Sequence, residues 1–414
     1  MLDFYVKSDF RLRRLRQCPV GEHMNGFADW LQSAGYQRRP AQLALRAAAH
    51  LSHWASARGV PTGRLDQQLD AFVRHLPACA CSHDFKGRDD YHAAGARRFV
   101  EYLQTIGVLP KTSAEPEPTP ALLAGFCDWM HTHRGVAEST LANYMPLVAD
   151  FIAALGDDTG AYDAGGIRAF ILARANRSGC GGAKSVANAV RMFLRFLAAH
   201  GDCSAELVAA VPRIAHWKLA ALPRYISAEA IEQLVAACDP TTAAGARDRA
   251  VILLLARLGL RAGDVRDLRL ADIDWPQGRL RVLGKGRCET WLPLPQAPGD
   301  ALLHYLADFR PEIDDDHVFL RLHAPLGPLP SSGPISKLVR RAIQRAGIET
   351  PSLGAHMLRH SAATDWLRQG SSLELIGVVL RHRCIESTAH YAKVDVAMLR
   401  SVAQPWPHDG ESPC

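Results

Sequence analysis

One stretch near the C-terminus decides the fold: it reads His356-Met-Leu-Arg-His-Ser-Ala-Ala-Thr364, then Leu380-Arg-His382, then His390-Tyr-Ala-Lys-Val394. These three motifs together hold four histidines, two arginines and a tyrosine. Cations and neutral imidazoles at helical spacing beside a phenol suit chemistry on a phosphate, because negative charge builds up there in the transition state. The stretch therefore predicts a phosphate site carried largely by helices.

The composition is that of a globular chain with room for several domains. Its 414 residues favour two or three domains, each large enough to bury a core. Hydrophobic residues make up 48% and charged residues 22%, which is typical of soluble globular proteins. The net charge of +6 permits nucleic acid as a partner, although many cytosolic proteins share so mild an excess.

The ten cysteines are scattered without the regular spacing of a disulfide framework. The N-terminus lacks the positive-then-apolar run of a signal peptide, and no apolar stretch reaches membrane-spanning length, so we expect a cytoplasmic protein. Cys79, Cys81 and His83 are candidate zinc ligands, but a second ligand pair at finger-like spacing is missing. No metal site is therefore predicted.

Residues 1–110 and 118–204 are predicted to be two versions of one four-helix domain. Gly26-Phe-Ala-Asp-Trp-Leu31 is echoed by Gly125-Phe-Cys-Asp-Trp-Met130, and later segments repeat in the same order, at offsets between 94 and 99. Ordered matches favour duplication over coincidence. The segment 111–117 between them lies in a proline-rich run and is predicted to be a linker.

Basic residues outside the C-terminal motifs leave two interpretations open. Residues 205–226 form a basic linker in which Arg213 and Lys218 alternate with aromatic residues, as in a strap along a DNA backbone or an ordinary hinge. Arg191 occupies the same place in its repeat as Arg97, and either caps a packed helix or faces a phosphate. The four arginines of residues 11–16 favour a solvated helix face over a DNA arm.

Residues 227–402 are predicted to form an α+β domain, followed by a tail over 403–414. Ser227 is a predicted helix N-cap, and a strongly apolar helix over 247–260 is broken at Gly259. Residues 278–284 alternate as a strand and 289–294 pair back across a tight turn. The predicted fold class is mainly α, with a small antiparallel sheet in this domain and all-helical domains before it.

Five motifs in this domain are informative only as a set. In order they are Gly259-Leu-Arg-Ala-Gly-Asp264, Gly284-Lys-Gly286, His356-Met-Leu-Arg-His360, Leu380-Arg-His382 and Tyr391. Each alone has an ordinary explanation, such as a helix stop, a tight hairpin or a packed aromatic ring. Together they supply guanidinium forks, imidazoles and a phenol, which are suited to a phosphate.

In these motifs, their order and their spacing, residues 224–400 resemble the catalytic domain of the tyrosine recombinase, or phage integrase, family. Residues 118–203 resemble, less specifically, its helical SAM-like core-binding domain. The resemblance implies a site-specific recombinase or integrase of a mobile element. Such an enzyme cuts and rejoins double-stranded DNA through a covalent 3′-phosphotyrosyl intermediate. It would act on the bacterial nucleoid as a homotetramer or pair of dimers, alone or with sister recombinases.

The resemblance also implies a catalytic set, which is Arg261, Lys285, His356, Arg359, His382 and Tyr391. The two arginines would bind the non-bridging phosphate oxygens, and the two histidines would donate hydrogen bonds or move a proton. Tyr391 would be the nucleophile, and Lys285 would protonate the leaving 5′ oxygen. No cofactor is implied, because arginines take the place of metal cations.

Three residues depart from the family's pattern or remain open. Asp264 stands where the family usually has glutamate, and is expected to orient Arg261 with a shorter reach. Arg381 stands where glycine is common, so it either contacts DNA phosphate or alters the start of a helix. His390 is a bystander or a local base, while His360 is expected to have a structural role.

Two other functions share parts of this set. A type IB topoisomerase-like relaxer would use the same residues as a monomer without site preference, but the tandem helical domains favour a site-reading recombinase. A catalytically silent DNA-binding protein would keep the fold, but the complete residue set argues against it. The segment 394–405 is predicted to be an amphipathic helix that docks on a neighbouring protomer or on its own domain.

Overall fold

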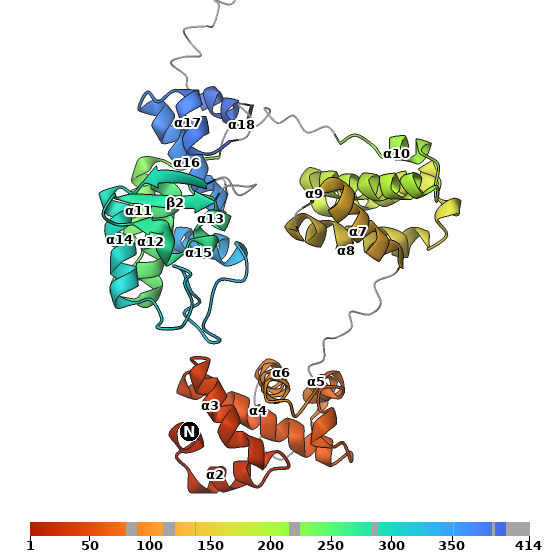
Figure 1. Cartoon of the computed structure of the whole chain (residues 1–414), viewed down its shortest axis with the longest axis vertical. Helices are drawn as coiled ribbons and strands as arrows, with labels where there is room; N and C mark the ends of the chain where they lie inside the picture. Colours follow the sequence, from red (N-terminus) through yellow and green to blue (C-terminus); the bar gives the residue numbers. More distant parts are fainter. Residues whose placement is uncertain are drawn as a thin grey trace, which may run out of the picture. The chain divides into compact units, whose positions relative to one another are not determined.

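The computed structural model describes residues 1–79, 89–110, 121–136, 138–214, 224–283, 289–350, 352–382 and 386–394. The described chain is mostly helical with one three-stranded antiparallel sheet, so the predicted fold class is confirmed. Two compact units are formed, one by Lys111–Lys218 and the other by Met1–Pro110 with Leu219–Cys414. Figure 1 shows their elements in the order of the sequence.

Residues 1–110 contain only helices where they are described. These are α1 Leu2–Tyr5, α2 Asp9–Arg16, α3 Met24–Ser33, α4 Arg38–Ser56, α5 Leu69–His75 and α6 Asp89–Thr105, with the short 3-10 helices η1 Gly21–His23, η2 Thr62–Arg64 and η3 Leu76–Ala78. The long helices α4 and α6 pack along each other, and α5 packs on α6. Apolar faces of these helices bury Phe27, Phe72 and Phe99 completely, so this part has a hydrophobic core of its own.

The unit Lys111–Lys218 is also helical and has a separate core. It consists of α7 Ala121–Arg134, α8 Glu138–Leu155, the 3-10 helix η5 Thr159–Ala161, α9 Ala164–His200 and α10 Glu206–Ala210. The carboxylate of Asp163 accepts hydrogen bonds from the first backbone N–H groups of α9 and so caps it. Helix α9 leaves helical geometry at Gly179, where φ is 67°, so it is two helices joined end to end.

The two helical parts have matching internal contacts. In the first, the rings of Phe27 and Phe99 meet edge to face with centroids 5.1 Å apart. In the second, Phe126 and Phe193 meet edge to face at 5.6 Å. These four residues occupy equivalent positions in the repeat that the sequence predicts, so the packing supports the duplication. The domain boundaries themselves stay predictions.

The repeated glycines have the same packing role in both parts. A Cβ at Gly26 would lie 2.1 Å from the Tyr102 hydroxyl, and one at Gly125 would lie 3.2 Å from Cζ of Phe196. Tyr102 and Phe196 are equivalent in the repeat. Glycine therefore lets an aromatic ring of α6 lie against the backbone of α3, and an aromatic ring of α9 lie against the backbone of α7.

The C-terminal part contains the sheet and most of the long apolar helices. Its elements are α11 Ala228–Ala236, α12 Ala243–Arg257, α13 Ala262–Asp267, η6 Leu270–Asp272, β1 Ile273–Asp274, β2 Arg279–Leu283, β3 Glu289–Pro293, α14 Gln296–Asp308, α15 Gly333–Ala346, α16 Ala355–Arg368, α17 Leu373–Val379, α18 Glu386–Ala389 and η7 His390–Val394. Helix α12 is buried because α11, α14, α15 and α16 all pack on it. The fold therefore has one central helix from which the site residues are positioned.

The sheet has the order β1-β2-β3, and each neighbouring pair is antiparallel. Buried Leu280 of β2 pairs with Ile273 of β1 and with Leu292 of β3, so one face of the sheet carries apolar residues. The predicted hairpin is therefore confirmed. Its connecting residues 284–288 lie outside the described residues.

Capping residues define the helix ends of this part. The Ser227 hydroxyl accepts a hydrogen bond from the Ala230 N–H, as predicted for an N-cap. Helix α12 begins earlier than predicted because Thr242 caps it through the Gly245 N–H. It ends at Arg257, and Gly259 follows with a φ of 60°. In the part of the chain that the structure describes, no helix is both long and apolar enough to span a lipid bilayer.

Candidate active site

The two predicted arginines converge on one backbone carbonyl. Arg359, within α16, donates from Nη2 to the Leu380 carbonyl at the end of α17. Arg261, the residue before α13, donates from Nη2 to the same carbonyl over 3.3 Å and to that of Arg381 over 3.2 Å. The motif around residue 261 and the motifs after residue 356 therefore form one cluster, although more than 90 residues separate them in the sequence.

Gly259 allows this convergence. A Cβ at this position would lie 2.7 Å from Cδ2 of Leu380 and 3.1 Å from the Trp366 ring. Its left-handed backbone turns the chain after α12, and its carbonyl accepts a hydrogen bond from Nη1 of Arg359 over 2.5 Å. The glycine therefore ends a helix and also brings that end against α17.

Arg359 and Arg261 are shielded from water and lie close to other charged groups. Arg359 is only 1% exposed, and burial together with the nearby charge of Arg261 lowers its pKa to about 10. Burial also lowers the pKa of Arg261. Both groups remain protonated at neutral pH, so the cluster holds two buried or half-buried positive charges that meet at the Leu380 carbonyl.

Tyr391 lies in η7 and is 2% exposed. Its hydroxyl is 2.9 Å from Nδ1 of His360. Burial raises the pKa of Tyr391 to about 12, although the charges of Arg359 and Arg261 oppose that rise. The phenol is therefore neutral at pH 7, and a neighbouring group must take its proton before it can act as a nucleophile.

His360, for which a structural role was expected, has its imidazole in hydrogen-bond contact with Tyr391. Burial, followed by the charges of His356 and His390, lowers the pKa of His360 to about 4. The ring is therefore neutral at pH 7 and able to accept a proton. The sequence did contain a signal, since His356 and His360 are four residues apart and share one helix face, with ring centroids at 4.4 Å.

The other two histidines of the cluster differ in exposure. His382 places Nδ1 2.8 Å from the hydroxyl of Thr388, and its ring is parallel to that of Tyr391 at 6.4 Å. Burial and then the charges of the arginines lower its pKa to about 4. His356, at the start of α16, is exposed. Thr388 is 1% exposed and was not predicted, because nothing in its sequence motif distinguishes it from a core residue.

Asp264 and Arg381 form an ion pair in which each side chain is 8% exposed. Oδ2 of Asp264 accepts a hydrogen bond from Nη2 of Arg381, and it also accepts one from the backbone N–H of Arg261 over 2.8 Å. Asp264 is thus in contact with Arg261, which it was expected to orient, through the main-chain N–H of that residue. Arg381 has a φ of 53° and is a left-handed residue just after the end of α17, whereas the expectation was a phosphate contact or an altered helix start.

The remaining candidates are two lysines, two arginines and a histidine. Lys285 and Lys218 are outside the described residues. Arg191 donates to the Asn188 side chain over 3.0 Å and to the Pro212 carbonyl over 3.2 Å, which favours the helix-packing interpretation. Arg213 is exposed. The ring of His390 lies 6.1 Å from that of Tyr391, and burial lowers its pKa.

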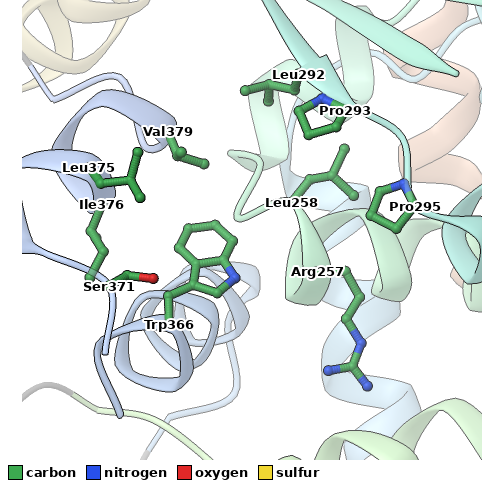
Figure 2. A pocket seen from close by; sticks show the side chains of 10 residues that line it. All are labelled: Arg257, Leu258, Leu292, Pro293, Pro295, Trp366, Ser371, Leu375, Ile376 and Val379. Atoms are coloured by element: carbon green, nitrogen blue, oxygen red, sulfur yellow. The ribbon is translucent and has the colours of Figure 1, made fainter. Parts of the chain in front are cut away.

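A pocket of about 280 Å³ lies between the end of α12, strand β3 and helices α16 and α17. Figure 2 shows the Trp366 indole between two groups of apolar side chains. The lining residues are Arg257, Leu258, Leu292, Pro293, Pro295, Trp366, Ser371, Leu375, Ile376 and Val379. The exposed Leu375 and Val378 on α17 extend this apolar surface towards solvent, so the pocket has the character of a site for an apolar side chain.

Comparisons with known proteins agree with the cluster. Residues 224–398 match the sequence profile of the phage integrase family. A putative integrase/recombinase of Sinorhizobium fredii (strain NBRC 101917 / NGR234), y4rA, is 35% identical over 99% of this chain and 100% of its own length. Tyrosine recombinase XerD of Lacticaseibacillus casei is 30% identical over 65% of this chain and 92% of its own length.

A solved structure shares the fold. It is a lambda integrase (75–356) dimer bound to a COC′ core site, with a TM-score of 0.54. The match covers 70% of this chain and 97% of that chain at 19% identity.

Proposed function

Because the chain belongs to the phage integrase family of tyrosine recombinases, we propose that it is a site-specific recombinase that cuts and rejoins DNA through Tyr391. One observation carries this proposal. Arg261 and Arg359 meet at the Leu380 carbonyl in the same cluster as the Tyr391 hydroxyl. Two guanidinium groups close to a phenol are what an in-line attack on a phosphodiester needs.

In the proposed cleavage step, Oη of Tyr391 attacks the scissile phosphorus. The Oη–P bond forms as the P–O5′ bond breaks, leaving a 3′-phosphotyrosyl linkage and a free 5′ hydroxyl. Arg261 and Arg359 stabilise the charge on the two non-bridging oxygens, with hydrogen bonds from His356 and His382. The carbonyls that hold both guanidinium groups fix them before DNA binds.

Two proton transfers accompany this step. His360 accepts the Tyr391 proton, since its neutral Nδ1 is 2.9 Å from the hydroxyl. Lys285, at the tip of the β2–β3 hairpin in the sequence, supplies the proton for the leaving 5′ oxygen. Rejoining reverses both transfers when a 5′ hydroxyl attacks the phosphotyrosine. The number of phosphodiester bonds is conserved, so no energy source is consumed.

A suicide duplex tests the assignment, because a nick beside the cleavage site traps the covalent adduct. We expect the wild-type chain to form an adduct that survives denaturing electrophoresis, and Tyr391→Phe to form none. Tyr305→Phe is a matched control, because that tyrosine is also fully buried in the same unit and is outside the cluster. An adduct with Tyr391→Phe would show that another residue is the nucleophile.

We further propose that the substrate is a pair of specific sites on double-stranded DNA, as for a mobile element. The names of the relatives, integrase and recombinase, support this proposal. A plasmid carrying two copies of the native flanking sequence should recombine in the presence of the chain. Relaxation of supercoils on plasmids without those sites would favour a topoisomerase instead.

The pocket beside α17 supports an oligomer on DNA. The predicted amphipathic segment 394–405 lies outside the described residues from residue 395 on, and we propose that it docks in this pocket of a neighbouring protomer. Its apolar side chains suit a pocket lined by leucine, proline and tryptophan. The related fold of a lambda integrase dimer bound to a core site is consistent with assembly on DNA.

Two complementary variants distinguish this arrangement from a tail folded onto its own domain. Leu375→Asp places a charge in the pocket, and a chain ending at Val394 lacks the tail. Each alone should fail to form dimers on DNA, whereas their mixture should form mixed dimers, because one supplies the pocket and the other the tail. Normal dimers from either variant alone would exclude docking between protomers.

A further inference from the structure

A group of metal-binding side chains lies in residues 1–110, outside the cluster around Tyr391. His50 is on α4, His75 is the last residue of α5, and Cys79 follows η3. Helices α4 and α5 both pack on α6, and Figure 1 shows the three near one another. We propose that His50, His75 and Cys79 bind a zinc ion that links these helices.

The spacing of the donor atoms suits three of the four ligand positions of a tetrahedral zinc. The three ligand atoms all lie within 4.8 Å of one another. Sγ of Cys79 is 3.4 Å from Nε2 of His50. Bond lengths of about 2.3 Å to sulfur and about 2.0 Å to nitrogen at a tetrahedral angle separate two such ligands by roughly 3.5 Å. The ligands therefore need little movement to bind an ion.

His92 completes the arrangement around His50. Its Nδ1 is 3.4 Å from Nδ1 of His50, and the two side chains are 6% and 1% exposed. When Nδ1–H of His50 donates this hydrogen bond to Nδ1 of His92, Nε2 of His50, which is close to Cys79, keeps a lone pair for the metal. A histidine ligand commonly donates its other ring nitrogen to such a partner.

The ligand types select the metal. One thiolate and two imidazoles favour zinc among the divalent ions, whereas magnesium and calcium prefer oxygen ligands. The donors come from three separate segments, so a bound ion would connect them as a structural site does. The sequence predicted no metal site because a second ligand pair at finger-like spacing was missing, whereas packing of α4 against α6 brings His50 close to Cys79 in space.

The test uses the full chain, purified without a histidine tag. Elemental analysis should find about one zinc per chain after dialysis against metal-free buffer. Replacement by Co²⁺ should give the ligand-field bands of a tetrahedral ion and a thiolate-to-cobalt charge-transfer band. A chain that carries no zinc and gives neither band on addition of Co²⁺ would overturn the proposal.

Matched variants identify the ligands. Cys79→Ser should remove the charge-transfer band, and Cys18→Ser, at a buried cysteine of the same core, should keep it. His50→Ala should lose zinc, whereas His53→Ala, on the exposed side of the same helix, should retain it. His92→Ala should weaken zinc binding about 10–100-fold through the loss of its contact with His50.

Folding is monitored independently, because His50 is buried and its replacement could disturb the core. Hydrogen exchange of peptides from α3, which carries none of the ligands, reports whether the variant remains folded. Loss of zinc with unchanged exchange in α3 supports the site. A charge-transfer band that persists in folded Cys79→Ser shows that another thiolate binds the metal and overturns the proposed ligand set.

Discussion

Asp264 and Arg381 are both departures from the family's sequence pattern, and they contact each other. The family's glutamate and glycine are replaced by a shorter carboxylate and a longer cation, which pair with each other in the interior. Either change alone would disturb the packing at these two positions. A shorter acid with glycine would leave a gap, and a longer acid with arginine would be overpacked. The two departures are therefore best understood as one compensated exchange.

A double exchange tests this compensation. Arg381→Gly should lower the free energy of unfolding by about 1–4 kcal/mol, because a broken buried pair costs about 3–5 kcal/mol and relief of the left-handed backbone returns about 1–2 kcal/mol. Asp264→Glu combined with Arg381→Gly should recover at least half of that loss. Calorimetry of the full chain measures both. Strictly additive effects would show that the two positions are independent.

The pH dependence of cleavage is a second consequence at this scale. His360 accepts a proton only when neutral, and its pKa is lowered to about 4. The single-turnover rate on a suicide duplex should therefore be flat from about pH 8 to pH 6 and fall only as the pH approaches 4. An ordinary histidine would halve the rate near pH 6.5, so an inflection there would contradict the role of His360.

The same shifts set the sign of the effect of pH on stability. His360 and His382 have folded pKa values below the ordinary 6.5. Between about pH 6.5 and pH 4 the unfolded chain therefore binds more protons than the folded chain. Their contribution to stability is complete above pH 6.5 and decreases as the pH falls through that window.

Sequence reasoning was most successful where residue type alone limits the chemistry. Arginines, imidazoles and a tyrosine in family order predicted which motifs would be brought together. Of the six predicted catalytic residues, the structure places Arg261, His356, Arg359, His382 and Tyr391 in one cluster, and Lys285 is outside the described residues. Sequence reasoning could not predict the contacts of His360, Thr388 or Arg381. Those depend on how α16, α17 and η7 pack, and no local pattern encodes the distance between side chains on different helices.

At the scale of elements, the end of α12 controls the site. Gly259 ends the helix, approaches Leu380 and offers its carbonyl to Arg359. The sequence predicted a helix stop there from the glycine alone. The sequence did not predict that α17 lies close to this glycine. A glycine that only ends a helix and one that also accommodates a neighbouring side chain cannot be distinguished in a sequence.

Two alanine substitutions separate the cost of the left-handed backbone from the cost of crowding against Leu380. Gly259→Ala should lower the free energy of unfolding by about 2–5 kcal/mol, since a left-handed alanine costs about 1–2 kcal/mol and overpacking adds about 1–3 kcal/mol. Gly278→Ala should cost only about 1–2 kcal/mol, because its φ of 57° is similar but its Cβ would have nothing within 4 Å. Equal losses, measured by calorimetry, would mean that crowding at Leu380 is unimportant.

At the scale of the whole molecule, most of the net positive charge is found in residues 1–110, the first of the two repeats. Residues 1–110 contain 15 lysines and arginines and 10 aspartates and glutamates, which accounts for five of the six net positive charges of the chain. A duplicated helical part with most of the excess charge is suited to a second DNA contact. The sequence predicts the helical fold of this part but not its binding partner, because a helical pattern does not identify a ligand.

Helix α2 offers the sharpest test of that contact. Arg11 and Arg13 are exposed, whereas Arg16 pairs with Asp3 over 2.9 Å. If α2 lies on DNA, replacing Arg11 and Arg13 by glutamine should reduce the slope of log affinity against log salt by up to about 0.9 for each lost phosphate contact. Arg16→Gln is the matched control and should change the slope less, because its charge is already neutralised.

The salt slope also distinguishes DNA contact from protein contact. Binding of the full chain to its native flanking DNA should weaken steeply as salt rises, with a shallower fall for the double variant and a footprint shortened at one end. An unchanged slope and footprint would instead make α2 a solvated helix face, as its sequence favours. The repeat would then be a duplicated fold whose first copy contacts protein, and the extra positive charge would serve solubility or the capture of a partner recombinase.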